Sequence, residues 1–335
     1  MTTTFRCFQD AYLTQLRETF HRPEFRNAPR GNPSSERIGV NFRLTDPVQR
    51  HVSLPARRVN PVFNVAEALW YLSGSRDLSF IGYYAPGIAR YSADGRTLQG
   101  TAYGPRIFEH RGLNQWENVR RTLGEDRDSK RAVIQIIGAH ELAIAGNIDV
   151  ACTLALQFMI RDDTLCGVGF MRANDAFRGM VSDVFSFTFI LEVMARQLGV
   201  EVGSYTHQVG SLHVYDSDVD WAQRVLAEAE LNTDPPAPMP PMPAGDNWPY
   251  IREVLAWEAL LRSDSVNLSP AALGRLDLPD YWQGIVGLFE VHRQIKHRTE
   301  MNLDVVQALP EPLRSAVVNR WPRVFAAVGL QAALF

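Results

Sequence analysis

The stretch DVACTLALQFMIRDDTLCGVGFMRANDAFRGMVSD, residues 149–183, carries most of the information about the fold. Residues 151–160 and 165–171 are rich in apolar side chains over short lengths, which is typical of β-strands in a buried sheet. The polar segment 161–164 between them has the length and composition of a hairpin turn. The sequence therefore predicts a β-hairpin with Cys152 near the start of its first strand.

The flanking chain predicts further elements on both sides of this hairpin. The apolar run 184–198 is followed by Gly199, which predicts a buried helix that ends in a glycine cap. Asn64 is expected to cap a helix that runs through Leu72 and ends at Ser73-Gly74. The other expected elements are a helix at 6–20, strands at 38–44, 132–137 and 201–215, and loops at 24–36 and 84–104.

The C-terminal third has a different character. Seven prolines lie between residues 235 and 249, and this density predicts a stiff linker. Residues 250–335 then show amphipathic helical patterns, such as 251–261 and 281–295. We therefore expect three parts, namely residues 1–234, a linker at 235–249 and a helical extension at 250–335.

The composition is that of an ordinary globular protein. The 335 residues are 46% hydrophobic, and no apolar run reaches the roughly 18–20 residues that a membrane span needs. A net charge of −3 gives no electrostatic drive toward nucleic acid. The N-terminus lacks the features of a secretory signal, and three cysteines (Cys7, Cys152 and Cys166) cannot build a disulfide framework. We expect a cytoplasmic enzyme that binds neither nucleic acid nor a membrane.

Two side chains in apolar surroundings are candidates for chemistry. Cys152 is typical of a buried strand cysteine unless a cation stabilises its thiolate, and Arg172 would supply that cation if the hairpin folds back. Glu67 lies in an otherwise apolar helix, where a carboxylate either faces solvent or is buried with a raised pKa that suits acid–base work. The spacing of His292 and His297 does not place both imidazoles on one helical face, so we expect no metal site.

Other polar residues could have purely structural roles. Asp183 stands where the hydrophobic helix is expected to begin, so it would serve as an N-cap. His213 and Tyr215 are two residues apart on a strand and share one face. Their structural role there would be partly buried packing. Lys130-Arg131, just before a strand, would be a solvated pair.

Taken in order, these residues resemble the thymidylate synthase superfamily over about residues 5–230. Six pieces carry the resemblance: EALWYLSG at 67–74, AYGPR at 102–106, SKR at 129–131, Cys152, RAND at 172–175 with Asp183, and SLHVY at 211–215. The resemblance implies an α+β, two-layer thymidylate synthase fold, a mixed β-sheet with packed helices, to which the C-terminal helical extension is added.

The resemblance also implies a chemistry. Cys152 would add to C6 of a pyrimidine nucleotide, whose C5 then attacks the methylene of the co-substrate 5,10-methylenetetrahydrofolate. Glu67 would handle protons, with Tyr103 in the same catalytic set. Arg172 and a loop arginine, Arg30 or alternatively Arg26, would hold the phosphate.

The remaining implied contacts concern the sugar, the folate and a second subunit. The family is a homodimer in which a basic pair reaches the phosphate of the partner's site. By similarity, His213 and Tyr215 bind the sugar hydroxyl, Asp175 and Trp70 contact folate, and Lys130 and Arg131 form the shared phosphate site.

Three departures from the family pattern favour a particular branch. Asp183 replaces the asparagine that reads uracil, and a protonated carboxyl matches the N3 acceptor and N4 donor of cytosine. No tryptophan occurs between Trp70 and Trp116, which would open the methylene to water rather than to hydride. Ala173 replaces a serine, which leaves room for a 2′-hydroxyl.

The sequence is therefore most similar to the cytidylate (CMP or dCMP) 5-hydroxymethylase branch, with CMP favoured over dCMP. The arginine-rich composition is typical of GC-rich coding, and a role in nucleoside-antibiotic biosynthesis would fit it. The alternatives are a dCMP hydroxymethylase, a true thymidylate synthase, or an inactive nucleotide-binding relative. An interaction protein built around the C-terminal helices is a further alternative.

Overall fold

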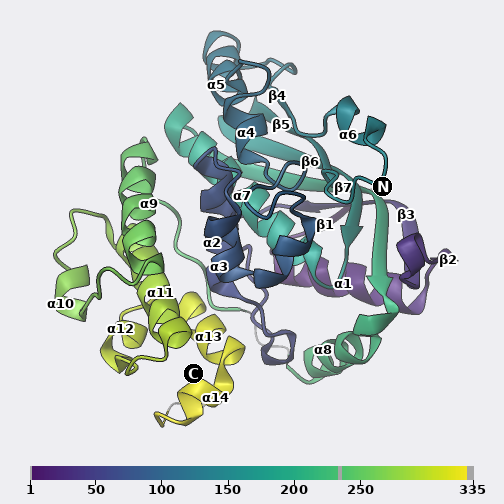
Figure 1. Cartoon of the computed structure of the whole chain (residues 1–335). Helices are drawn as coiled ribbons and strands as arrows, with labels where there is room; N and C mark the ends of the chain where they lie inside the picture. Colours follow the sequence, from purple (N-terminus) through teal and green to yellow (C-terminus); the bar gives the residue numbers. More distant parts are fainter. Residues whose placement is uncertain (1, 233–235, 330–335) are drawn as a thin grey trace.

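The computed structural model describes residues 2–232 and 236–329. Within these ranges a seven-stranded mixed sheet forms the centre of the molecule, in the order β1-β3-β7-β6-β5-β4, with β2 beside β3 (Figure 1). The strands are β1 Thr3–Phe5, β2 Phe25–Asn27, β3 Ser34–Leu44, β4 Val133–Gln135, β5 Thr153–Arg161, β6 Thr164–Asp175 and β7 Glu201–Tyr215.

The sheet confirms the expected mixed α+β class. The pairs β6–β7 and β1–β3 are parallel, whereas β5–β6, β3–β7 and β4–β5 are antiparallel. The β5–β6 hairpin turns through Asp162 and Asp163, whose φ angles of 48° and 56° are those of a tight left-handed turn that aspartate tolerates. The predicted hairpin and the predicted strand 201–215 are therefore confirmed.

Helices cover the sheet and extend to one side of it. Helices α1 and α7 pack against β3, β6 and β7, and α2 packs on α7. The first eight helices are α1 Phe8–His21, α2 Pro61–Leu72, α3 Leu78–Tyr84, α4 Gly104–Phe108, α5 Gln115–Glu125, α6 Ala139–Ala143, α7 Gly179–Leu198 and α8 Val219–Leu231. The short 3₁₀ turns are η1 Pro29–Gly31, η2 Pro55–Arg57, η3 Pro86–Tyr91 and η4 Asp216–Asp218.

The expected start of the Glu67 helix was wrong. The side chain of Asn60, not that of Asn64, accepts a hydrogen bond from the Phe63 amide at 3.1 Å and caps the helix. Pro61 occupies the first turn, where a missing N–H costs nothing. Asn64 is inside the helix and accepts from the Ser182 hydroxyl at 2.9 Å.

The segment 84–104 is more ordered than the expected surface loop. It contains η3, and its last residues, Ala102 and Tyr103, are buried. A Cβ at Gly100 would lie 1.9 Å from the carbonyl oxygen of Asp149. Only glycine permits this approach, so the segment passes directly against the chain that leads to Cys152.

The C-terminal helices pack beside α2 and α3 on one side of the molecule (Figure 1). They are α9 Trp248–Arg262, α10 Pro270–Leu273, α11 Asp280–His297, α12 Leu303–Gln307, α13 Glu311–Arg320 and α14 Pro322–Ala326. The Tyr84 hydroxyl donates to Glu258 at 2.6 Å, and the rings of Phe189 and Trp282 meet edge to face at 6.1 Å.

The described part of the proline-rich segment lies against the core. Met239 and Met242 are buried, and the Met242 amide donates to Glu192 at 2.7 Å. Glu192 is also ion-paired with Arg50. The expected boundary at residues 234 and 235 and the last six residues of the expected extension lie outside the described residues.

Candidate active site

A cleft of about 540 Å³ opens where β6 and β7 end. Its walls come from segments far apart in the chain, since η1, η3 and the turns after both strands all contribute. The lining residues are Arg30, Asn32, Pro33, Arg90, Tyr91, Ile148, Asp175, Arg178, Tyr215, Ser217 and Asp218. The sequence-predicted residues Arg30, Asp175 and Tyr215 therefore meet at one place.

Cys152 lies just before β5 and beside Arg172 of β6. The Arg172 guanidinium donates to the carbonyls of Ala151 at 2.8 Å and Val150 at 3.0 Å, and its Nη2 lies 3.5 Å from the Cys152 Sγ. The hairpin thus folds the expected cation back onto the thiol. Burial still raises the pKa of the thiol, with Arg172 opposing the rise.

Two carboxylates bind backbone amides around the segment that leads to Cys152. Asp149 accepts from the amides of Gln99 at 2.7 Å and Thr101 at 2.7 Å. Glu141 accepts from the Ala151 amide at 2.7 Å, the residue next to the cysteine. Because these acceptors bind backbone donors, they fix the main chain that presents the thiol.

Glu67 is buried in α2, where a carboxylate has few partners. The Ser186 hydroxyl donates to it at 3.2 Å. Burial, with the nearby Asp183 charge adding to the effect, raises the pKa of Glu67 to about 8. The carboxyl is therefore mainly protonated at neutral pH and can give up or take a proton there.

Asp183 does not cap a helix. Helix α7 begins at Gly179, so Asp183 lies in its second turn, and the expected capping role is excluded. Its Oδ2 accepts from the side chain of Asn174 at 2.7 Å. Burial, with the charge of Asp175 adding, raises the pKa of Asp183 to about 7 although Asn174 opposes the rise.

The two loop arginines differ in their surroundings. Arg26 donates to Asp216 at 2.6 Å and to Ser35 at 2.8 Å, so its guanidinium is engaged. Arg30 lines the cleft with a left-handed backbone, φ 52°, and its charge opposes the rise in the pKa of Cys152. Arg30 is thus the loop arginine that faces the site.

The expected sugar and folate residues divide into two groups. His213 and Tyr215 lie side by side on β7 with ring centroids 4.9 Å apart, and Asp175 pairs in register with His213. Asp175 accepts from the Phe177 amide at 2.8 Å. Trp70, in contrast, is fully buried in the core and does not line the cleft.

Tyr103 lies beside the catalytic candidates. It is buried and stacks on Tyr71 with ring centroids 4.7 Å apart. Burial raises the pKa of its hydroxyl well above the usual value, and the charges of Asp183 and Cys152 add to the rise. Tyr103 is therefore a neutral hydroxyl close to both groups.

The expected phosphate residues Lys130 and Arg131 lie elsewhere. Both are exposed before β4, and neither lines the cleft. Ala173 is half-buried on β6 and pairs in register with Ser211. The described residues of one subunit thus do not include the basic pair in the wall of this cleft.

Sequence reasoning missed several lining residues. Arg90 and Tyr91 come from η3, in a segment expected to be a plain loop, and the Arg90 guanidinium donates to the Tyr91 hydroxyl at 2.8 Å. Arg178 pairs with Asp218 across the cleft wall. The sequence carried no signal for Arg90, whereas Asn174 stood inside the RAND segment without an assigned role.

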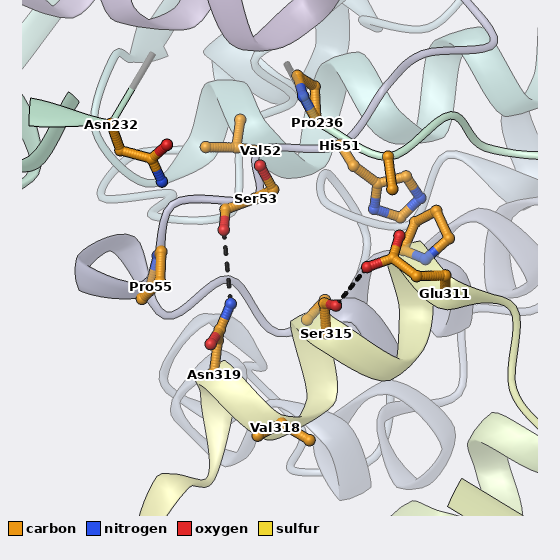
Figure 2. A pocket seen from close by; sticks show the side chains of 13 residues that line it. His51, Val52, Ser53, Pro55, Asn232, Pro236, Glu311, Ser315, Val318 and Asn319 are labelled. Carbon is orange, nitrogen blue, oxygen red and sulfur yellow. Dashed lines mark hydrogen bonds between the residues drawn. The ribbon is translucent and has the colours of Figure 1, made fainter. Parts of the chain in front are cut away.

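A second cavity of about 200 Å³ lies between α13 and the segment around Ser53 (Figure 2). Asn319 donates to the Ser53 carbonyl at 3.4 Å, and Ser315 donates to Glu311 at 2.7 Å. His51 also lines it, and burial lowers the pKa of this imidazole to about 3. The cavity shares no lining residue with the cleft, so the two are separate.

Two other kinds of site are absent from the described residues. Among the described residues, no group of three histidine, cysteine, aspartate or glutamate side chains is arranged to hold a metal ion. None of the helices in the described ranges is long and apolar enough to cross a membrane.

Comparison with known proteins agrees with this geometry. The family model described as thymidylate synthase matches residues 10–239. The chain is 34% identical over 203 residues to a deoxyuridylate hydroxymethyltransferase of Bacillus phage SP01, covering 57% of this chain and 53% of the relative. It is 32% identical over 199 residues to the protein of the same name from Delftia phage PhiW-14, covering 56% and 55%.

A third relative, from Pseudomonas phage M6, carries the same name and is 31% identical over 210 residues, covering 59% of this chain and 58% of the relative. The matched segment thus spans a little over half the length of each relative. None of the three matches spans the whole of either protein.

Proposed function

The chain belongs to the thymidylate synthase family, and from this premise we propose that it is a folate-dependent cytidylate 5-hydroxymethylase. It takes CMP in preference to dCMP, uses 5,10-methylenetetrahydrofolate as the one-carbon donor and captures the transferred methylene with water. Its place in metabolism would be the supply of a modified cytidylate, such as a precursor of a nucleoside antibiotic.

The observation that carries the choice of base is the carboxyl of Asp183. Its raised pKa keeps a proton available near neutral pH, so the group can donate to N3 of cytosine and accept from the N4 amino group when the proton lies on the oxygen that faces N3. The charge of the ionised form acts on Glu67 and Tyr103, which supports a place for Asp183 within the catalytic cluster. An ionised carboxylate, by contrast, would repel the O4 carbonyl of uracil.

The reaction can be written with these side chains. The Cys152 thiolate forms a bond to C6, and the ring electrons move toward C5 and N3. C5 then bonds to the methylene carbon, and the bond from that carbon to the folate nitrogen breaks. A base removes the C5 proton, water adds its oxygen to the resulting exocyclic methylene, and the thiolate leaves C6. The products are 5-hydroxymethylcytidylate and tetrahydrofolate, with no oxidation or reduction.

Glu67 is the group best suited to the proton transfers. It is buried beside Asp183, and its carboxyl titrates near the working pH. A proton donor close to N3 stabilises the charge that develops there when C6 is attacked. Because Cys152 and Glu67 are both present, the alternative of an inactive nucleotide-binding relative is less well supported.

Water rather than hydride is favoured by the lining of the cleft. Arg90 and Tyr91 form part of the wall contributed by the segment after the Glu67 helix, where the sequence has no tryptophan. A polar wall tolerates an ordered water better than an indole does. The word hydroxymethyltransferase in the names of the three relatives supports the same outcome.

The guanidinium groups of two arginines would bind the phosphate. Arg172 lies at Cys152 and Arg30 lines the cleft, so both can pair with phosphate oxygens. His213 and Tyr215 would bind the sugar, where Ala173 leaves space for the 2′-hydroxyl of CMP. Asp175 would contact the pterin.

The active unit would be a homodimer formed through the sheet face. Lys130 and Arg131 are exposed and lie apart from the cleft of their own subunit. Exposed apolar strand residues, Ile38, Val133 and Leu154, support burial of the sheet by a second copy. The basic pair would then reach the partner's phosphate.

Product analysis tests the proposal directly. The enzyme is incubated with methylenetetrahydrofolate and CMP, dCMP, UMP or dUMP, and products are identified by mass and chromatography. We expect 5-hydroxymethyl-CMP to form fastest. A methylated product would indicate a thymidylate synthase, and turnover of uridylates alone would overturn the cytosine assignment.

A second candidate is hydroxymethylation of deoxyuridylate. The names of all three relatives favour it. In the same assay, this alternative predicts 5-hydroxymethyl-dUMP as the main product and slow turnover of both cytidylates. A dCMP hydroxymethylase would instead prefer dCMP over CMP.

A further inference from the structure

Asp183 lies at the end of a buried chain of hydrogen bonds. Its Oδ2 accepts from Asn174 Nδ2 at 2.7 Å. Asn174 Oδ1 lies 2.9 Å from His207 Nε2, and His207 Nδ1 lies 2.8 Å from the Tyr205 hydroxyl. Asn174, His207 and Tyr205 are 4%, 0% and 1% exposed, so solvent cannot replace any of these bonds. We call these three residues the relay.

A neutral carboxyl on its own does not distinguish cytosine from uracil. Cytosine requires one donated and one accepted hydrogen bond at N3 and N4, and uracil requires the opposite pair at N3 and O4. A protonated carboxyl can present either arrangement, because the proton can reside on either oxygen. Selection of cytosine by a neutral Asp183 therefore needs a neighbour that decides which oxygen carries the proton.

We propose that the relay makes this choice, so that Asn174 and Tyr205 are positioning residues for base specificity. The proposal rests on the proposed cytidylate hydroxymethylase function and deepens it. The amide nitrogen of Asn174 donates to Oδ2 of Asp183, which leaves Oδ1 as the oxygen that holds the proton. The carboxyl then has a fixed polarity, with a donor at Oδ1 and an acceptor at Oδ2, and it matches cytosine with Oδ1 placed toward N3 and Oδ2 toward N4.

The direction in which the relay donates its hydrogen bonds follows from Tyr205, the relay residue farthest from Asp183. Among the described residues, the Tyr205 hydroxyl makes its only hydrogen bond with His207. If Tyr205 donates to Nδ1, then Nε2 carries the imidazole proton and donates to Asn174 Oδ1, and the amide must donate to Asp183. In the opposite direction Tyr205 accepts, and its own proton is buried without a partner, which is costly.

The surroundings favour this direction. Burial lowers the pKa of His207 to about 3, so the ring is neutral and has a single proton to place. Space for the tyrosine hydroxyl is made by Gly169 on the neighbouring strand, since a Cβ there would lie 2.3 Å from the Tyr205 oxygen. Strand β7 carries Tyr205 and His207 two residues apart, on the same face.

The experiment compares kcat/KM for CMP and UMP, with methylenetetrahydrofolate, in the parent and in Tyr205→Phe. This variant keeps the ring and removes only the hydroxyl that sets the direction. We expect the CMP:UMP ratio to fall about tenfold, which is the scale of one buried hydrogen bond. Asn174→Ala should lower the ratio in the same direction. Tyr84→Phe, which removes another buried hydroxyl with one acceptor, Glu258, should leave it unchanged.

The outcomes separate this inference from the function on which it rests. A parent that prefers CMP, with Tyr205→Phe and Asn174→Ala both within twofold of its ratio, would overturn the relay and leave the proposed function standing. A parent that prefers UMP would overturn both. A general loss of structure lowers the rates for both nucleotides and leaves their ratio unchanged. If Asn174→Ala does not fold, Tyr205→Phe decides.

Discussion

The Nη2 atom of Arg172 lies 3.5 Å from the Sγ atom of Cys152. The guanidinium is tied to the carbonyls of Ala151 and Val150, so the charge stays beside the thiol. Burial nevertheless raises the pKa of the thiol, because the loss of hydration outweighs the opposing charges of Arg172 and Arg30. Before substrate binds, Cys152 is therefore mainly a thiol at neutral pH.

Removal of this thiol tests its role as the nucleophile. Cys152→Ala should bind CMP but show no turnover and no exchange of the C5 hydrogen with solvent, since both need the bond to C6. Exchange is measured by NMR in deuterated buffer. Cys166→Ala, which removes a half-buried cysteine of β6, should retain activity. Exchange that persists in Cys152→Ala would contradict the assignment.

Glu67→Gln should lower kcat by roughly two to four orders of magnitude, the usual span for loss of an acid–base group. The amide keeps the shape of the side chain but cannot transfer a proton, so nucleotide affinity should change only a few-fold. Steady-state kinetics and calorimetry measure the two effects. Glu258→Gln alters another buried glutamate, in α9, and should keep kcat near that of the parent.

Stability should fall as the pH rises from about 5 to 9. The folded pKa values of Asp183 and Glu67, about 7 and about 8, exceed those of the unfolded chain, near 4. Between these values the folded state holds more protons, so the free energy of unfolding decreases with pH. From pH 5 to pH 9, denaturant unfolding should show a loss of roughly 3–4 kcal/mol per group, at about 1.4 kcal/mol for each pH unit below the folded pKa.

Glu67→Gln and Asp183→Asn provide the control for this pH effect. Each variant removes one titrating carboxyl, so its unfolding free energy should depend less steeply on pH than that of the parent. Equal slopes in the parent and both variants would show that neither carboxyl has a raised pKa in the folded state.

Asp183→Asn should shift the preference from cytidylates toward uridylates by roughly ten- to a hundred-fold, the cost of one or two mismatched buried hydrogen bonds. The asparagine amide presents a donor to O4 and an acceptor to N3–H of uracil. The ratios of kcat/KM for CMP and UMP, and for dCMP and dUMP, measure the shift. Because α7 begins at Gly179, an effect on helix capping does not complicate the result.

Mixed dimers should test whether two subunits share the phosphate site. Cys152→Ala and Arg131→Ala homodimers should both be inactive or nearly so. After subunit exchange, heterodimers contain one site with both the cysteine and the partner's arginine, and activity should return to a fraction of the parent value. Exchange is verified by mass spectrometry of tagged subunits. Verified exchange without recovery would contradict sharing.

The local elements could be predicted from the sequence because short-range rules determine them. The β5–β6 hairpin follows from two apolar runs around Asp162-Asp163, residues that tolerate the left-handed turn. Helix α7 ends before Gly199, which adopts φ 68° as expected of a glycine cap. Asn60 caps α2 four residues before Asn64, because Pro61 allows the helix to begin ahead of its main apolar run.

The candidate site residues could likewise be proposed from the sequence. Cys152, Glu67, Asp183 and the RAND segment stand in the order of a known family, and the structure brings Cys152 and Arg172 together as the hairpin hypothesis required. The order of residues along the chain predicts which side chains form the candidate site. It does not predict whether those side chains are charged or which of them donate the hydrogen bonds.

Those properties come from contacts between residues far apart in the sequence. Asp183 lost its apparent capping role only when α7 was seen to begin at Gly179. The relay joins Asn174 to His207 across two strands, 33 residues apart. Burial raises the pKa values of Asp183 and Glu67, and burial is produced by the packing of α2 on α7. The sequence by itself determined which groups are present, and only the tertiary structure, by removing water from them, decided which of these groups hold protons and toward which neighbour.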